Sequence, residues 1–273
     1  MKQILVATDF SNCASNAMEY ALELASILHF EVCAIHAIHP TEGIDNSIYN
    51  AIYIENYYNS KRQALAHWAK NLSDQKAYTQ VKVTTLCAVG FLNAVISNHI
   101  ADHPAELLIM GITGSTGISG IVGSTANMIV SKLKLPTLIV PLESKPSKKP
   151  VITLATDFST ELSATDVNIL KELIQAFETD VLHVLNVMDK LDISPAITGE
   201  RVLKEYFKPV ALQFNYISHS STTDGIMDFV VNNKTDILCV VKHHHNMLYR
   251  IFNRSTVNQV MNKSIKAILV LHE

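Results

Sequence analysis

An internal repeat is the feature that most constrains this chain. Residues 4–11 read ILVATDFS and residues 152–159 read ITLATDFS, so six of eight letters agree. Later segments correspond as well, STANMIVSKLKLPTLIV at 124–140 and STVNQVMNKSIKAILV at 255–270. A repeat on this scale predicts two copies of one folding unit. The 273 residues are enough for two domains of ordinary size.

Both copies alternate short apolar runs with stretches in which apolar residues recur at helical spacing. This alternation is typical of β–α units around a parallel sheet that helices cover on both faces. The sequence therefore predicts an α/β fold of two tandem, doubly wound domains, each with a parallel five-stranded sheet and four helices. The expected strands lie near residues 3–7, 31–38, 82–89, 106–110 and 137–140, and near 151–155, 180–187, 214–219, 237–241 and 267–271.

The stretch PLESKPSKKP at 141–150 marks the joint between the copies. Its three prolines and three lysines are typical of an exposed connection between domains. We predict domains at residues 1–141 and 151–273 with a linker at 142–150.

Composition and charge exclude several classes of protein. Apolar residues make up 48% and charged residues 17%, which indicates a folded chain. A net charge of -3 leaves no basic surplus for nucleic acid. No window reaches the roughly 20 apolar residues of a membrane span, and MKQILVATDF is no signal peptide. A cytoplasmic location is therefore favoured, with four dispersed cysteines expected as buried free thiols: Cys13, Cys33, Cys87 and Cys239.

Two segments stand where ligands bind in an open parallel sheet, beyond the carboxyl ends of strands at the point where the strand order reverses. Asp9 follows the first expected strand, where it suits a ligand hydroxyl or amino group but equally suits a turn, with Ser11 as helix N-cap. Ser124-Thr125 opens a helix whose positive end favours phosphate. Before it, five of the nine glycines let backbone N–H groups approach a ligand: Gly111, Gly114, Gly117, Gly120 and Gly123.

These motifs resemble the universal stress protein family. The TDFS opening, the second apolar run with its histidine, and the G-x2-G-x8-G-S-T run carry the resemblance, which covers nearly the whole chain, once per copy. It implies an adenine nucleotide alpha hydrolase-like, Rossmann-like fold. It also implies a stress-response regulator that binds ATP or another adenine nucleotide. The sequence shows no catalytic constellation, general base or fixed metal ligand, so we expect no enzyme, with any hydrolysis slow and Mg²⁺ arriving only with the phosphates. The nucleotide-binding residues implied are Asp9, Ala37, Met110, Gly111, Gly114, Gly123, Ser124 and Thr125.

The first copy departs from the family pattern in ways that predict weak binding. Eight residues separate Gly114 from Gly123 where the pattern has nine, and residues 110–130 contain no Lys or Arg. Phosphates would be held by backbone amides, hydroxyls and the helix end alone, without the stronger charge-assisted bonds. Ala7 and Ala37 stand where larger residues are usual, which loosens the adenine slot.

The second copy departs further. Val241, His244 and Arg254 stand where the three glycines of the pattern belong. Side chains there would fill the space for a phosphate, so we predict that only the amino-terminal domain binds nucleotide. Asp157 and Ser159 are interpreted as capping residues.

The resemblance also implies that the last strands, near Leu138–Val140 and Ile268–Leu271, pair the two copies as an internal pseudo-dimer. It leaves open whether two chains associate further. His36 and His183 are expected as core histidines because each lies in an apolar run.

Alternatives remain open. If both loops have lost nucleotide, the chain is an interaction or scaffold protein of the same fold. A dinucleotide or electron-transfer enzyme is disfavoured because the glycines follow the fourth expected strand and not the first. The run His243–His245 favours a polar loop over a metal site, or a basic rim formed together with Lys242, Arg250 and Arg254 that attracts an anion. The tyrosine-rich segment 43–59 predicts amphipathic helical packing, with a lid or partner surface as the alternative.

Overall fold

The computed structural model describes residues 2–42, 51–74, 78–112, 124–158, 164–188, 196–242 and 254–272. Within these ranges all ten expected strands are present, with a helix in every expected gap. The first half consists of β1 (Gln3–Ala7), α1 (Asn12–Leu28), β2 (Glu31–Ile38), α2 (Ala51–Ser73), β3 (Val83–Val89), α3 (Leu92–Asp102), β4 (Leu107–Ile112), α4 (Ser124–Lys132) and β5 (Thr137–Pro141). The second half consists of β6 (Ile152–Ala155), α5 (Ala164–Ala176), β7 (Val181–Met188), α6 (Ala196–Tyr206), β8 (Ala211–Ser218), α7 (Thr222–Asn232), β9 (Ile237–Lys242), α8 (Arg254–Lys263) and β10 (Ala267–His272).

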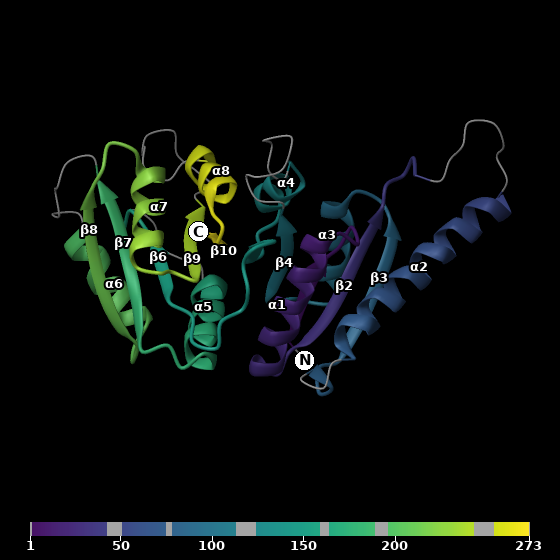
Figure 1. Ribbon diagram of the computed structural model, residues 1–273, viewed down its shortest axis with the longest axis horizontal. Helices are drawn as coiled ribbons and strands as arrows, with labels where there is room; N and C mark the ends of the chain where they lie inside the picture. The colour runs from purple at the N-terminus through teal and green to yellow at the C-terminus, as the bar shows by residue number, and fades with distance from the viewer. Residues whose placement is uncertain are drawn as a thin grey trace.

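The ten strands form one sheet, in the order β3-β2-β1-β4-β5-β10-β9-β6-β7-β8 (Figure 1). Strands within each half are parallel, whereas β5 and β10 pair antiparallel, with Leu138 opposite Leu269. The last strands therefore pair with each other, as the resemblance implied. This pairing protects two apolar strand edges that would otherwise be open to association.

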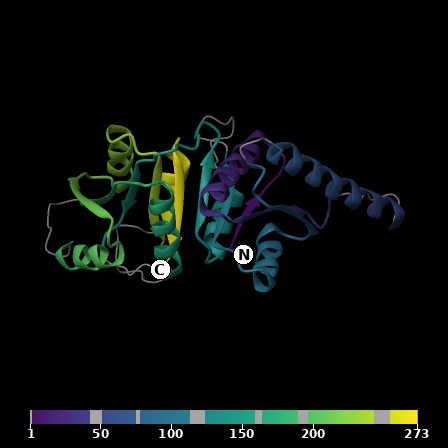
Figure 2. The ribbon, with the colours of Figure 1, turned by 90° about the horizontal axis from the view of Figure 1, so that it is seen from below.

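Helices cover both faces of the sheet (Figure 2). Residues of α1, α2, α5 and α6 enter the core on one face, and residues of α3, α4, α7 and α8 enter the core on the other. The central strands β4, β5, β9 and β10 are buried almost throughout, which explains their continuous apolar runs.

The edge strands β3 and β8 are only partly covered. The expectation of four buried thiols is wrong for Cys87 on this account, since it lies on β3 and is half-buried. Cys13, Cys33 and Cys239 are buried. Burial raises the pKa of the Cys239 thiol, which therefore stays protonated at neutral pH.

The end of β5 and the residues that follow it are bound to α1. Asn16, 4% exposed, donates its two amide N–H groups to the carbonyls of Pro141, at 2.9 Å, and Ser144, at 2.8 Å. Its Oδ1 accepts a 2.8 Å hydrogen bond from Lys145 Nζ. Tyr20 donates its hydroxyl to the carbonyl of Lys145, at 2.8 Å. The stretch expected as a linker is thus fixed to the first half at its start.

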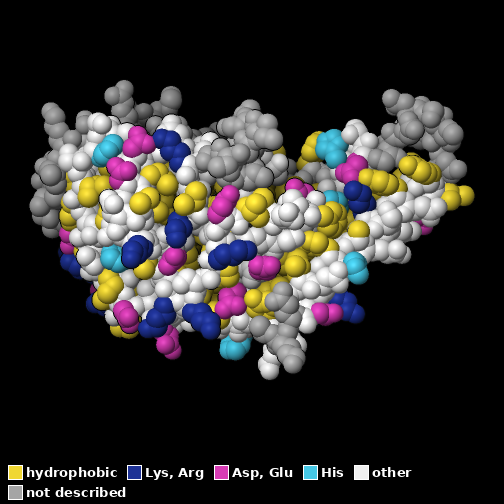
Figure 3. Space-filling view, viewed as in Figure 1, with side chains coloured by type: hydrophobic (Ala, Val, Ile, Leu, Met, Phe, Trp, Pro, Cys, Tyr) yellow, Lys and Arg dark blue, Asp and Glu magenta, His cyan; other side chains and the backbone are white. Residues whose placement is uncertain are grey.

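Helix α2 projects beyond the edge of the sheet (Figure 1). The predicted helix is present from Ala51, but the predicted packing holds only for its later turns, where Leu65 and Ala69 are buried. Ile52 is 68% exposed and Tyr53 56% exposed, and apolar side chains line the projecting end (Figure 3). Residues 43–50 of the tyrosine-rich segment lie outside the described ranges.

Glu42, which follows β2, binds two side chains of α2, and its carboxyl group should make the stability of the protein depend on pH. Its Oε1 lies 2.8 Å from Lys61 Nζ and accepts a 2.6 Å hydrogen bond from the Tyr57 hydroxyl. The Lys61 ammonium and the Tyr57 hydroxyl lower the pKa of this carboxyl from 4.5 to about 2. A lowered pKa means stability that is present above pH 4.5 and lost as the pH falls towards 2.

We therefore expect the free energy of unfolding to fall more steeply between pH 4.5 and 2 in the wild type than in Glu42→Gln. The difference should stay below about 1 kcal/mol because solvent screens this surface pair. Urea unfolding at a series of pH values measures it. Glu205→Gln, which removes the exposed partner of Lys208, is the matched control and should follow the wild-type pH dependence. Equal slopes for wild type and Glu42→Gln would contradict the prediction.

Candidate functional site

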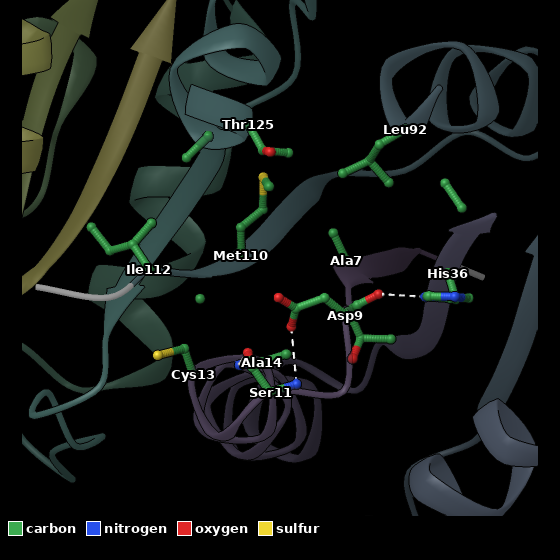
Figure 4. A pocket seen from close by; sticks show the side chains of 14 residues that line it. Ala7, Asp9, Ser11, Cys13, Ala14, His36, Leu92, Met110, Ile112 and Thr125 are labelled. Carbon is green, nitrogen blue, oxygen red and sulfur yellow. Dashed lines mark hydrogen bonds between the residues drawn. The ribbon is translucent and has the colours of Figure 1, made fainter. Parts of the chain in front are cut away.

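A cavity of about 380 Å³ opens at the carboxyl ends of β1, β2 and β4 (Figure 4). The chain runs outward from β1 to β2 and β3 and then returns to place β4 on the other side of β1, so the strand order reverses here. Ligands of open α/β sheets bind at such a switch point. The first turns of α1, α3 and α4 complete the wall.

The cavity brings together most of the described residues that the sequence predicted for a site. Asp9, Ala37, Met110, Gly111 and Thr125 all line it. Gly114 and Gly123 lie outside the described residues, as does the side chain of Ser124.

A tight turn after β1 places Asp9 at the mouth of the cavity. Thr8 Oγ1 accepts from Phe10 N–H, Asp9 Oδ1 accepts from Ser11 N–H, and both distances are 2.9 Å. Phe10 has a φ of 66°, a conformation that the turn imposes. Ser11 caps α1 by accepting from Ala14 N–H at 3.2 Å. One oxygen of Asp9 thus holds the turn while the other faces the cavity (Figure 4). The same side chain can therefore stabilise the turn and bind a ligand.

Gly111 allows α1 to begin directly against the end of β4. A Cβ at this position would lie 2.3 Å from the carbonyl oxygen of Cys13 and 2.8 Å from the backbone nitrogen of Ala14. No side chain fits there without moving the helix. The amino-terminal ends of α1 and α4, the latter at Thr125, therefore both border the cavity. Helix amino termini carry partial positive charge and favour anions.

The remaining wall is apolar. Ala7, Ala37 and Met110 contribute from the strands, and Leu92 contributes from the first turn of α3. Small side chains at the two alanines keep the space beside Leu92 open. Sequence reasoning missed Leu92, together with Cys13, Ile112 and Ala126. The signal that identifies Leu92 and Ala126 is their place at the start of a helix that follows a strand.

His36, on the neighbouring strand β2, contacts the turn. Its Nδ1 lies 2.9 Å from the carbonyl oxygen of Thr8, and its ring contacts Phe10 with centroids 4.5 Å apart. At 8% exposure it is buried, as the sequence predicted, but it also lines the cavity, which was not expected from the sequence. The prediction is wrong for His183, which lies on β7 near the start of the strand and is only half-buried. Burial nevertheless lowers the pKa of His183.

The strand registers show which residues correspond between the halves. Ala7 pairs with Ile35 in the first half, and Ala155 pairs with Leu185 in the second. Asn186 is therefore the counterpart of His36, and it makes the same contact, donating to the carbonyl of Thr156 at 2.7 Å. Val187 is the counterpart of Ala37.

The same reasoning makes Val241 the counterpart of Gly111, because Ala7 pairs with Met110 and Ala155 with Val240. Val241 is 4% exposed. Val187 packs so closely on α7 that a Cβ at Gly225 would lie 2.8 Å from its Cγ1. The second half thus has valine at both positions, where the first half has Ala37 in the cavity wall and Gly111 in close contact with the first turn of α1. Ser159, His244 and the run His243–His245 lie outside the described residues.

Fold and cavity together define a tandem, doubly wound α/β protein with a ligand-sized cavity at the switch point of its first half. Residues 1–141 match the universal stress protein family, and the chain belongs to that family.

Individual relatives agree with this assignment. Universal stress protein MJ0577 of Methanocaldococcus jannaschii is 27% identical over 152 residues, which cover 51% of this chain and 94% of that protein. Universal stress protein MJ0531 of the same organism is 28% identical over 156 residues, 54% of this chain and 85% of that protein. A crystal structure of a universal stress protein from Archaeoglobus fulgidus has a similar fold, with a TM-score of 0.76 at 16% identity, covering 98% of this chain and 97% of that one. Among the helices that the structure describes, none has the length and apolar character needed to cross a bilayer.

Proposed function

We propose that the first half binds ATP or another adenine nucleotide in the cavity and that the second half does not. The observation that carries the proposal is the cavity at the switch point, where Gly111 lets the first turn of α1 lie against β4, whereas its counterpart Val241 has a buried side chain. Its volume of about 380 Å³ lies within the range of small-molecule sites.

The chemistry of the wall supports an adenine nucleotide. The apolar side, formed by Ala7, Ala37 and Leu92, suits a flat base. Asp9 suits a ribose hydroxyl or an amino group, since a carboxylate only accepts hydrogen bonds. The helix ends at Ser11 and Thr125 suit the phosphates, which would bring Mg²⁺ with them.

Binding should be weak, and the nucleotide should act as a regulatory ligand. None of the described residues that line the cavity is a Lys or Arg, so phosphates gain no charge-assisted bond from them. We also propose that the chain is a cytoplasmic stress-response regulator and not an enzyme. Its two domains would comprise residues 1–141 and 151–273, joined by a linker at 142–150. Association of two such chains is testable by sedimentation.

The internal repeat supplies a matched pair of variants. We expect Asp9→Asn to weaken binding of ATP with Mg²⁺ about tenfold or more, because the cavity loses a charged acceptor worth about 1.5 to 3 kcal/mol. Asparagine retains the side-chain oxygen that holds the turn at Ser11. Asp157→Asn, at the equivalent position of the second half, should leave the affinity unchanged. Isothermal titration calorimetry measures both.

An absence of heat from the wild type, or equal losses in both variants, would count against the proposal. The first result would favour the second candidate, an interaction or scaffold protein. The observation in favour of that candidate is the projecting end of α2, where Ile52 and Tyr53 expose apolar surface.

A further inference from the structure

Helix α4 carries part of the cavity wall at one end and touches the second half at the other. Thr125 and Ala126 line the cavity, and Val130 lies in the last turn. The carbonyl groups of a last helical turn have no partner within the helix. What satisfies the carbonyl of Val130 therefore helps to determine where α4 lies.

Two side chains of the second half approach that carbonyl. Lys242, at the end of β9, donates from Nζ to the carbonyl oxygen of Val130 at 2.6 Å. His272, at the end of β10, places Nε2 3.4 Å from the same oxygen. Both side chains are buried, with 4% and 2% exposure. The register pairs Lys242 directly with His272, so they reach α4 from neighbouring strands.

The charge of Lys242 suits this place. A helix carries partial negative charge at its carboxyl end, and an ammonium group there stabilises it. Burial of the contact limits its screening by salt. The second half thus holds the carboxyl end of the helix whose amino end borders the cavity.

The corresponding residues of the first half cannot make the same contact to the second half. The counterpart of Lys242 in the first half is Ile112, and the residue paired with Ile112 on β5 is Pro141, the counterpart of His272. Neither Ile nor Pro has a side-chain donor. The two halves have therefore diverged here in a way that repetition of the fold does not require.

We propose that Lys242 and His272 are positioning residues, through which the second half fixes α4 for nucleotide binding in the first half. This inference rests on the proposed function. It assigns the second half a role in the ligand site of the first half. Because α4 has only nine residues, a shift at Val130 moves Thr125 as well.

The test uses the full-length chain and two readouts. We expect Lys242→Met to speed hydrogen exchange of the α4 amides without nucleotide and to weaken binding of ATP with Mg²⁺ about fivefold to thirtyfold. Lys242→Gln, which keeps a neutral donor, should give an intermediate result. Lys263→Met removes an exposed lysine that pairs with Asp224 and should match the wild type in both readouts. Affinities are compared below the unfolding transition of each variant.

Unchanged exchange in α4 would overturn the inference. Faster exchange with unchanged ATP affinity would overturn it too, since Lys242 would then only stabilise the helix. If the wild type binds no ATP, the proposed function fails, and the exchange readout still decides whether the second half fixes α4. Should Lys242→Met not fold, Lys242→Gln and His272→Gln decide by the same two readouts.

Discussion

Gly111→Val should abolish ATP binding, with an affinity at least about a hundredfold below that of the wild type. The new Cβ would meet the carbonyl oxygen of Cys13 at 2.3 Å, so the first turn of α1 must move. Movement of that turn displaces Asp9 and Ser11 and disturbs the helix end at the cavity. The change also gives the first half the residue that Val241 supplies in the second. Isothermal titration with ATP and Mg²⁺ measures the loss.

Overpacking also costs stability, typically about 1 to 3 kcal/mol, so a control must separate strain from loss of the site. Gly199→Val provides it, because a Cβ at Gly199 would lie 2.5 Å from Phe158 Cβ in the second half. We expect this control to lower the melting temperature while the ATP affinity stays at the wild-type value. Retention of wild-type affinity by Gly111→Val would remove the main support for the cavity as the binding site.

The sequence predicted the sheet well because most strands are covered on both faces. Central strands need unbroken apolar runs, and those runs are visible without a structure. The error at β8 has the same origin. It was expected from residue 214 but begins at Ala211, because an edge strand with exposed Ala211 and Gln213 does not need a continuous apolar run.

The site was less accessible to sequence reasoning. Asp9 and Gly111 stood out through the repeat and the glycine cluster, and both line the cavity. The histidines in β2 and β7 do not show which residues of these two strands correspond. The connection from β6 to β7 is two residues longer than that from β1 to β2, so Asn186 and not His183 corresponds to His36.

Contacts between distant segments were not predictable. Lys242 looked like part of a basic rim next to His243, yet it is buried against Val130 of the other half. Nothing in the local sequence distinguishes an exposed lysine from one that reaches a helix end 112 residues away. The same holds for Asn16: nothing in the sequence of α1 indicates that its partners are Pro141, at the end of β5, and Ser144.

Asn16→Leu is the second substitution with a large expected effect, and it acts on stability. Leucine has nearly the same size, but it leaves the carbonyls of Pro141 and Ser144 buried without their donor. An unsatisfied buried polar group costs about 1 to 3 kcal/mol. We expect the free energy of unfolding to fall by about 2 to 4 kcal/mol, measured by urea denaturation.

Two control variants should lose less free energy of unfolding than Asn16→Leu. Tyr20→Phe removes one hydroxyl from the same network and should cost about 1 kcal/mol. Asn71→Leu changes an exposed asparagine of α2 and should stay within about 0.5 kcal/mol of the wild type. A wild-type urea midpoint for Asn16→Leu would mean that the start of the linker is not held by α1. The ordered loss expected instead, largest for Asn16, would show that the connection between the halves is part of the folded core.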